Sequence, residues 1–217
     1  MAMKKNTLIV AAGIVVLGLA AAIGASAPGT AAGEGPSDEQ VVVALRLLAP
    51  GVGDFDACRS GAGVEAQYRR WYGYGGLALS VGMERWASAS RSGNWNAASL
   101  DGHALLFPLG GSALGRWPLS EGLMLRGEIG LRYVQVSSSL SKRTEVASDR
   151  ESIRLSNGVV FVGALGAEQL LTETLFVFGD VVYQHDLLRG RARTRAGDIM
   201  RNHLLGVGVR FGIQYWF

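Results

Sequence analysis

The chain has 217 residues, with 21 Lys or Arg against 18 Asp or Glu, a formal charge of +3. This balance excludes a dedicated nucleic-acid-binding protein. A content of 48% hydrophobic and only 18% charged residues argues against intrinsic disorder. A single Cys excludes an intrachain disulfide framework and a Cys-rich zinc site. Gly is unusually frequent, at 31 residues, but Pro occurs only 5 times, which excludes a collagen-like or Pro-rich chain.

The first residues have the pattern of an export signal. Lys4 and Lys5 give a positive start, and residues 7–23 carry no charge. That length suits a signal-peptide core and is marginal for a membrane-spanning helix. We predict a signal peptide over residues 1–27, with cleavage between residues 25 and 32, and export by the general secretory route. The alternative is an uncleaved N-terminal anchor.

A short flexible lead-in at residues 28–39 is followed by segments with the period of a β-strand. No apolar run as long as the first one recurs, which excludes a helical membrane protein. In one segment Asp101 shares the parity of Leu105, so we expect the inward face to change at a bulge near Pro108. Eight strands are predicted, at residues 40–49, 62–72, 75–88, 99–109, 121–138, 153–168, 174–188 and 201–217.

The connections between these strands alternate in length. Short ones are expected at residues 73–74, 110–120 and 169–173, whereas the others are longer and polar. Short turns on one rim and long loops on the other, with an even number of strands, are typical of outer-membrane barrels. The predicted fold is therefore all-β, an eight-stranded antiparallel up-and-down transmembrane barrel over residues 40–217.

The polar face of the strands is predicted to line the barrel, and the apolar face to contact lipid. Glycines alternate with charged residues on the polar face, and Lys142 is the only Lys left once the leader is removed. The exposed face of a soluble sheet normally carries more Lys and Glu. An eight-stranded barrel is just wide enough to be filled by side chains, and closure pairs every backbone polar group, as hydrocarbon requires.

The predicted lumen contains equal numbers of acidic and basic side chains. Buried charges persist only when they are paired, and Arg suits bidentate pairing. We therefore expect a plugged lumen whose charges are structural rather than catalytic. The predicted network comprises Arg46, Glu65, Arg69, Glu84, Asp101, Arg126, Glu128, Arg132, Arg154, Asp180, Asp186 and Arg210.

Aromatic residues are expected to form girdles at the two membrane interfaces. The alternative is an aromatic core of a β-sandwich. The predicted girdle at the short-turn rim comprises Trp71, Tyr72, Tyr74, Trp117, Tyr215, Trp216 and Phe217, and the opposite girdle Trp86, Tyr133 and Tyr183.

The C-terminal residues provide the most specific motif. The last eight residues read RFGIQYWF, with Arg210, Gly212, Tyr215 and Phe217 at the informative places. This ending resembles the C-terminal signature of outer-membrane barrels. The whole of residues 40–217 resembles the small eight-stranded outer-membrane barrel proteins of the OmpA, OmpX and opacity type. The resemblance implies a place in the outer membrane of a Gram-negative bacterium and recognition of the last strand by the barrel-assembly machinery.

The sequence contains no motif for catalysis or metal binding. His103, His185 and His203 do not stand at metal-ligand spacing with another His or Cys. Lipid A deacylases resemble this fold but carry a His and a Ser two residues apart on one strand face, a pair that none of these His makes. We therefore predict no catalytic residue, no metal site, no cofactor and no enzyme activity.

The fourth long connection carries alternating arginines, Arg189, Arg191, Arg193 and Arg195. On an extended ribbon they would point to one side and pair with lipopolysaccharide phosphates; a solvated strand extension is the alternative. The predicted function is a non-enzymatic barrel serving envelope integrity or surface interaction through its loops, with outer-membrane lipid and lipopolysaccharide as partners and no nucleic acid. The alternatives are a narrow channel for small or hydrophobic solutes and, third, a lipid A-modifying enzyme.

Overall fold

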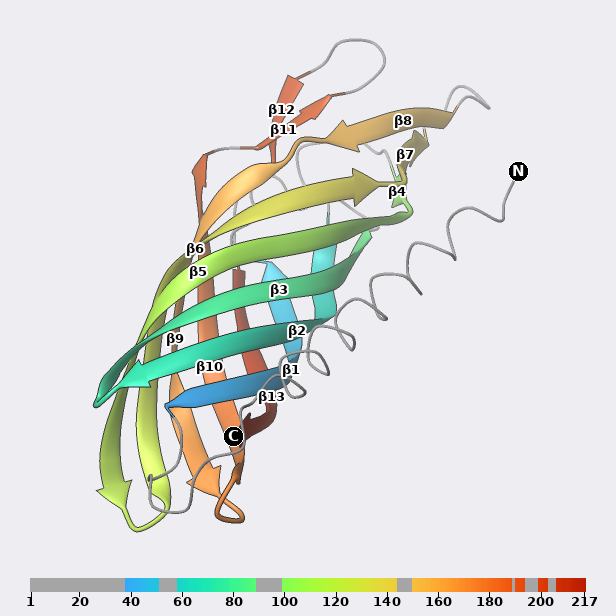
Figure 1. Ribbon diagram of the computed structural model, residues 1–217. Coiled ribbons are helices and arrows are strands. Elements are labelled where there is room, and N and C mark those ends of the chain that lie inside the picture. The colour runs from blue at the N-terminus through green and yellow to red at the C-terminus, as the bar shows by residue number, and fades with distance from the viewer. Residues whose placement is uncertain are drawn as a thin grey trace.

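The computed structural model describes residues 38–50, 58–88, 99–143, 150–188, 190–193, 199–202 and 206–217. Eight strands close into an antiparallel barrel in the order β1-β13-β10-β9-β6-β5-β3-β2, so each pairs with its neighbours in the chain (Figure 1). The all-β up-and-down barrel is thus confirmed. The barrel strands are β1 (Glu39–Pro50), β2 (Cys58–Tyr72), β3 (Gly75–Ser88), β5 (His103–Ser120), β6 (Leu123–Ser138), β9 (Gly158–Leu170), β10 (Leu175–Leu188) and β13 (Gly206–Trp216).

Five short strands form a second sheet beyond one rim of the barrel, at the top of Figure 1. They come from the second, third and fourth long connections, which this sheet joins into one extension. We call this end of the barrel the long-loop rim. In the order β12-β11-β8-β7-β4, the strands are β12 (Ile199–Asn202), β11 (Gly190–Arg193), β8 (Arg150–Leu155), β7 (Leu140–Arg143) and β4 (Ser99–Asp101).

The opposite end, the short-turn rim, carries the tight turns and both ends of the barrel sequence. Gly73 and Gly122 occupy two of the turns with φ of 69° and 72°, a conformation that favours glycine. Trp216 N donates to Thr174 O of the third turn at 2.9 Å, and Trp71 N donates to Asp38 O at 2.7 Å. These bonds hold the first and last strands to the same rim. The predicted leader over residues 1–27 lies outside the described residues.

Several details of the predicted strand map were wrong. Residues 110–120 are not a connection, because β5 continues to Ser120 and the chain turns at residues 121–122. The face change expected near Pro108 does not occur either, since the even-numbered residues of β5 point inward on both sides of it. Instead, the pairing of β3 with β5 skips Gly82 and Met83. Proline has no N–H to donate there.

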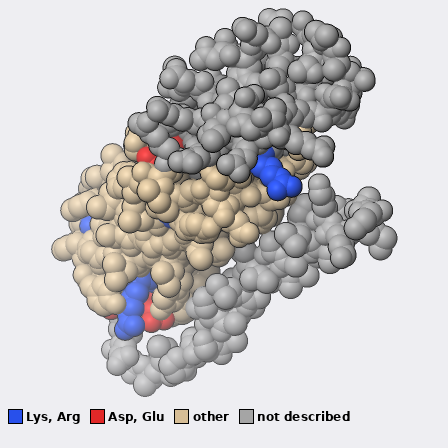
Figure 2. Space-filling model, turned by 90° about the horizontal axis from the view of Figure 1, so that it is seen from above, with Lys and Arg blue, Asp and Glu red and all other residues tan. Residues whose placement is uncertain are grey.

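The outward side chains form an apolar belt around the barrel. Val43, Leu45 and Leu47 of β1 are each nearly half exposed, and Leu79 and Ile129 on other strands more than half. On the face seen in Figure 2, the described barrel surface is almost free of charged side chains between its ends. An apolar surface of this extent is unfavourable in water and matches hydrocarbon. Among the described residues, no helix is long and apolar enough to cross a membrane.

Candidate functional site: the filled lumen

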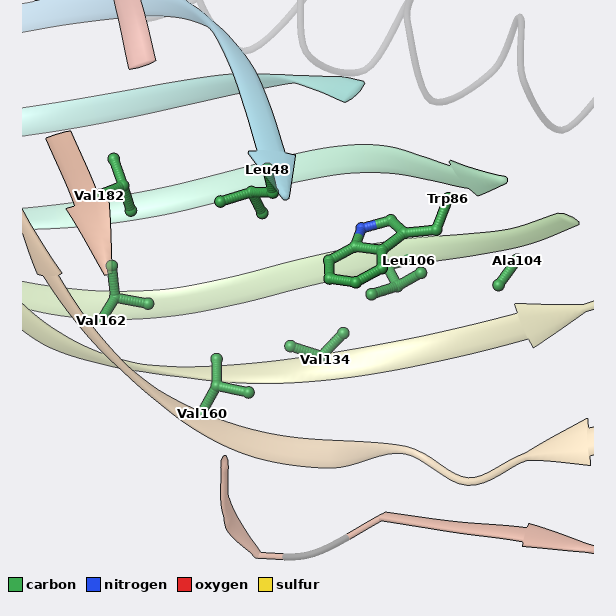
Figure 3. Close-up of a cluster of buried hydrophobic side chains, with 8 residues drawn as sticks. All are labelled: Leu48, Trp86, Ala104, Leu106, Val134, Val160, Val162 and Val182. Carbon is green, nitrogen blue, oxygen red and sulfur yellow. The ribbon is translucent and has the colours of Figure 1, made fainter. Parts of the chain in front are cut away.

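Three layers of inward side chains fill the barrel. A charged layer lies in the middle, and apolar layers lie on either side of it. The layer toward the short-turn rim, called here the aromatic layer, contains Trp71, Ala78, Leu114, Phe176 and Trp216. The layer toward the long-loop rim, called the upper apolar layer, contains Leu48, Trp86, Ala104, Leu106, Val134, Val160, Val162 and Val182 (Figure 3).

Arg210 of β13 is the centre of the charged layer. Its guanidinium donates to Glu65 Oε1 at 2.9 Å and to Glu128 Oε2 at 2.6 Å. It also donates to Asp180 Oδ2, from Nη2 at 2.6 Å and from Nε at 2.9 Å. All four side chains are buried. The three carboxylates come from β2, β6 and β10. The Arg210 guanidinium therefore links these three strands to β13 by charge-assisted hydrogen bonds.

Arg132 and Arg46 continue this network toward the long-loop rim. Arg132 donates to Glu65 Oε2 at 2.6 Å and to Glu128 Oε1 at 3.3 Å. Arg46 pairs with Glu84 at 2.5 Å and with Glu65 at 3.4 Å. Glu65 therefore contacts the guanidinium groups of Arg46, Arg132 and Arg210. The charges at the centre of the lumen thus form one connected network.

The network continues toward the short-turn rim through Arg126 and Arg69. Arg126 donates to Asp180 Oδ2 at 3.0 Å. Arg69 is held by amides instead, donating to Gln67 Oε1 at 2.8 Å and to Gln214 Oε1 at 3.0 Å. The ring centroid of Phe178 lies 4.0 Å from the guanidinium carbon of Arg126 and 5.7 Å from that of Arg69. Cation–π contacts thus border the charged layer on this side.

The structure brings most of the predicted network residues together. Asp186 is also buried, but the side chain of Asp101 lies outside the described part. Arg154 does not join them: its side chain is exposed on β8, in the second sheet. The period-two pattern breaks at residues 157–158, so β8 and β9 belong to different sheets. The residues that meet are Arg46, Glu65, Arg69, Glu84, Arg126, Glu128, Arg132, Asp180 and Arg210.

Sequence reasoning missed several uncharged members of this layer and one acid. Ser112 Oγ donates to Glu128 Oε1 at 2.9 Å, and Gln214 Nε2 donates to Glu168 Oε2 at 2.8 Å. Gln214 lies two positions from Gly212 on the inward face of β13, and Glu168 shares the parity of Val162 on β9. Strand parity was therefore the signal that could have identified them.

The predicted aromatic girdles were wrong for three tryptophans. Trp71, Trp86 and Trp216 point inward and are buried. Trp86 Nε1 donates to Glu84 Oε2 at 3.0 Å, and Trp71 Nε1 donates to Gln40 Oε1 at 2.8 Å. All three have the parity of the polar residues on their strands. The side chains that do lie exposed on the outside or at the rims are Tyr72, Tyr74, Trp117, Tyr133, Tyr183 and Tyr215.

The C-terminal motif occupies both faces of β13. Arg210 and Gly212 face the lumen, and a Cβ on Gly212 would lie 2.2 Å from Val43 O of the neighbouring strand. Tyr215 points outward, and its ring stacks on that of Phe217 at 6.3 Å between centroids. Of the alternating arginines, Arg191 and Arg193 belong to β11, with side chains outside the described part, as are Arg189 and Arg195.

One His–Ser contact forms at the long-loop rim. Ser139 Oγ lies 3.4 Å from His103 Nδ1, but it donates to the main-chain oxygen of His103 at 3.1 Å. Among the described side chains, no carboxylate orients His103. The hydroxyl of Ser139 therefore links β5 to the chain just after β6. The described residues also contain no group of His, Cys, Asp and Glu that is arranged to hold a metal ion.

The chain matches solved structures in fold, although no protein-family model and no curated protein sequence matches it. Outer membrane protein OprG from Pseudomonas aeruginosa is 14% identical, covers 85% of this chain and 98% of its own, and has a TM-score of 0.60. Outer membrane protein AlkL is 13% identical, with 88% and 95% coverage and a TM-score of 0.53. A major outer membrane protein from Thermus thermophilus is 14% identical, with 82% and 98% coverage and a TM-score of 0.50. The chain therefore has the fold of the small outer-membrane barrels.

Proposed function

We propose that this protein is a non-enzymatic outer-membrane barrel with a plugged lumen, acting in envelope integrity or surface interaction through its long connections. The observation that best supports a plugged lumen is the set of buried contacts of Arg210 with Glu65, Glu128 and Asp180. Breaking such a network leaves buried charges unpaired, which is strongly unfavourable. The apolar belt and the fold of the matched outer-membrane proteins support the location. The chain would reach it by the general secretory route.

In this proposal the short-turn rim faces the periplasm and the long-loop rim faces the cell exterior, the usual orientation of such barrels. The five-stranded extension then projects past the lipid headgroups. β11 would place Arg191 and Arg193 near the phosphates of lipopolysaccharide. The barrel-assembly machinery would recognise Arg210, Gly212, Tyr215 and Phe217 during insertion.

Replacing Arg189, Arg191, Arg193 and Arg195 by Gln is expected to weaken binding to lipopolysaccharide by about tenfold, because each loses a charge-assisted contact with phosphate. Binding of the folded protein to vesicles with and without lipopolysaccharide measures the effect. Arg70→Gln is the matched control, since Arg70 lies on the barrel wall and is 57% exposed. Equal binding by the four-site variant and the unmodified protein would contradict the role of this loop.

A narrow channel for small or hydrophobic solutes is the second candidate. The observation in its favour is the upper apolar layer, whose side chains, drawn in Figure 3, would suit an apolar solute. Ala104 is fully buried in this layer, so Ala104→Leu would fill space that a solute crossing the layer would need. Faster entry of an apolar solute into liposomes that hold the protein, slowed by this variant, would support the channel. Entry at the rate of protein-free liposomes would contradict it.

A further inference from the structure

A pocket of about 560 Å³ lies at the short-turn rim, at the end of the lumen opposite the loops. Its walls are mostly apolar and include Pro118, Met124, Leu170 and Phe176. The volume lies within the range of pockets that hold small organic molecules, which combine apolar walls with a few polar groups. The polar groups in this pocket define the ligand.

Two hydrogen-bond donors in the pocket lining are buried and unpaired. Within the described part of the chain, neither Nη1 of Arg116 nor Nε1 of Trp216 has a hydrogen-bond partner. Trp216 is only 7% exposed. Most buried donors in folded proteins are paired, with protein atoms, ordered water or a ligand. A molecule with acceptor oxygens would satisfy both.

The Arg116 guanidinium is fixed in position. Its carbon lies 4.5 Å from the ring centroid of Trp71 and 4.9 Å from that of Trp216. Its Nε donates to Gly73 O at 3.2 Å. The side chain is thus held by stacking and by one hydrogen bond, whereas its Nη1 has no acceptor among the described residues. A preorganised donor of this kind loses little conformational freedom when a ligand binds.

Two carboxylates, those of Asp38 and Glu173, line the same pocket. No ion pair is found for either among the described side chains. With one guanidinium against two carboxylates, the ionised lining carries a net charge of −1. A simple anion is therefore disfavoured, whereas a molecule that carries both an ammonium and a carboxylate complements all three groups.

We propose that this pocket binds a small zwitterion with an apolar body, of the amino-acid or short-peptide class. Its carboxylate accepts hydrogen bonds from Arg116 Nη1 and Trp216 Nε1. Its ammonium pairs with Asp38 and Glu173, and its apolar body packs against Phe176. The site is separate from the loop surface and does not depend on what that surface binds.

Leucyl-leucine is the probe, with the protein folded in phospholipid nanodiscs. The indole N–H resonance of Trp216, assigned through Trp216→Phe, is expected to shift as the dipeptide is added. N-acetyl-leucyl-leucine, which lacks the ammonium, and leucine isoamylamide, which lacks the carboxylate, are each expected to bind about tenfold more weakly. A Trp216 resonance that does not move at millimolar dipeptide would mean that water alone fills the pocket, and would overturn the proposal.

Variants assign each end of the probe to its partners. Arg116→Gln is expected to weaken leucyl-leucine binding about tenfold while leaving leucine isoamylamide unaffected, and Arg116→Lys to weaken it less. Asp38→Asn with Glu173→Gln is expected to weaken the dipeptide but not its N-acetyl form. Arg70→Gln, on the outer wall, is the matched control. Equal affinity for the dipeptide and both analogues, or an Arg116→Gln variant that folds and binds normally, would also overturn the proposal.

Discussion

Replacing Arg210 by Met is expected to lower the free energy of unfolding by about 3–5 kcal/mol. The guanidinium contacts Glu65, Glu128 and Asp180 at 2.6–2.9 Å. Methionine preserves much of the volume but leaves these buried carboxylates with less counter-charge. Urea unfolding of the protein in lipid vesicles, followed by tryptophan fluorescence, measures the change.

Arg70→Met is the matched control for this variant. The Arg70 side chain is 57% exposed and lies 3.9 Å from Glu39, so its loss is expected to change stability by about 1 kcal/mol or less. Adding Glu128→Gln to Arg210→Met is expected to recover part of the lost stability, because one unpaired charge is removed. Equal destabilisation by the Arg70 and Arg210 variants would contradict the network.

Replacing Gly110 by Ala is expected to destabilise the barrel by about 2–3 kcal/mol. An added Cβ would lie 2.1 Å from Leu131 O and 2.8 Å from Arg132 Cα. Both are backbone atoms of the neighbouring strand β6, so relief requires the two strands to move apart. The same urea unfolding assay measures the loss.

Gly111→Ala is the control, one residue along the same strand. There the nearest atom to an added Cβ is Ala78 O, at 3.7 Å, an ordinary contact. The expected change is within about 0.5 kcal/mol. Similar effects of the two substitutions would contradict the close approach of β5 to β6 at Gly110.

Strand parity explains why much of the fold could be predicted from the sequence. A strand buried on one face repeats every two residues, so Arg46 and Leu47 are assigned to opposite faces without knowledge of any partner strand. The same rule applied to Trp71 and Trp216 would have placed them in the lumen. Their nearness to a rim instead suggests an interfacial girdle, because aromatic residues are common at membrane interfaces. Strand parity is the stronger guide, since it fixes the face to which each side chain points.

The pairing inside the lumen could not be read from the sequence. Parity says that Arg210 and Glu65 point inward, but their 2.9 Å contact depends on the stagger of strands far apart in the chain. Arg154 was misplaced because its segment alternates like a barrel strand yet pairs within the second sheet. The pocket at Arg116 was missed because it is assembled from turns and strand ends, each with little pattern of its own.

Single-channel recording in a planar bilayer tests the plugged lumen most directly. Insertion is first verified by the difference in gel mobility between heated and unheated protein. The charged layer around Arg210 predicts that the inserted, unmodified protein gives no conductance steps at neutral pH. Reproducible steps from the unmodified protein would contradict the account, because ions would then be crossing the layer that Arg210, Glu65 and Glu128 close.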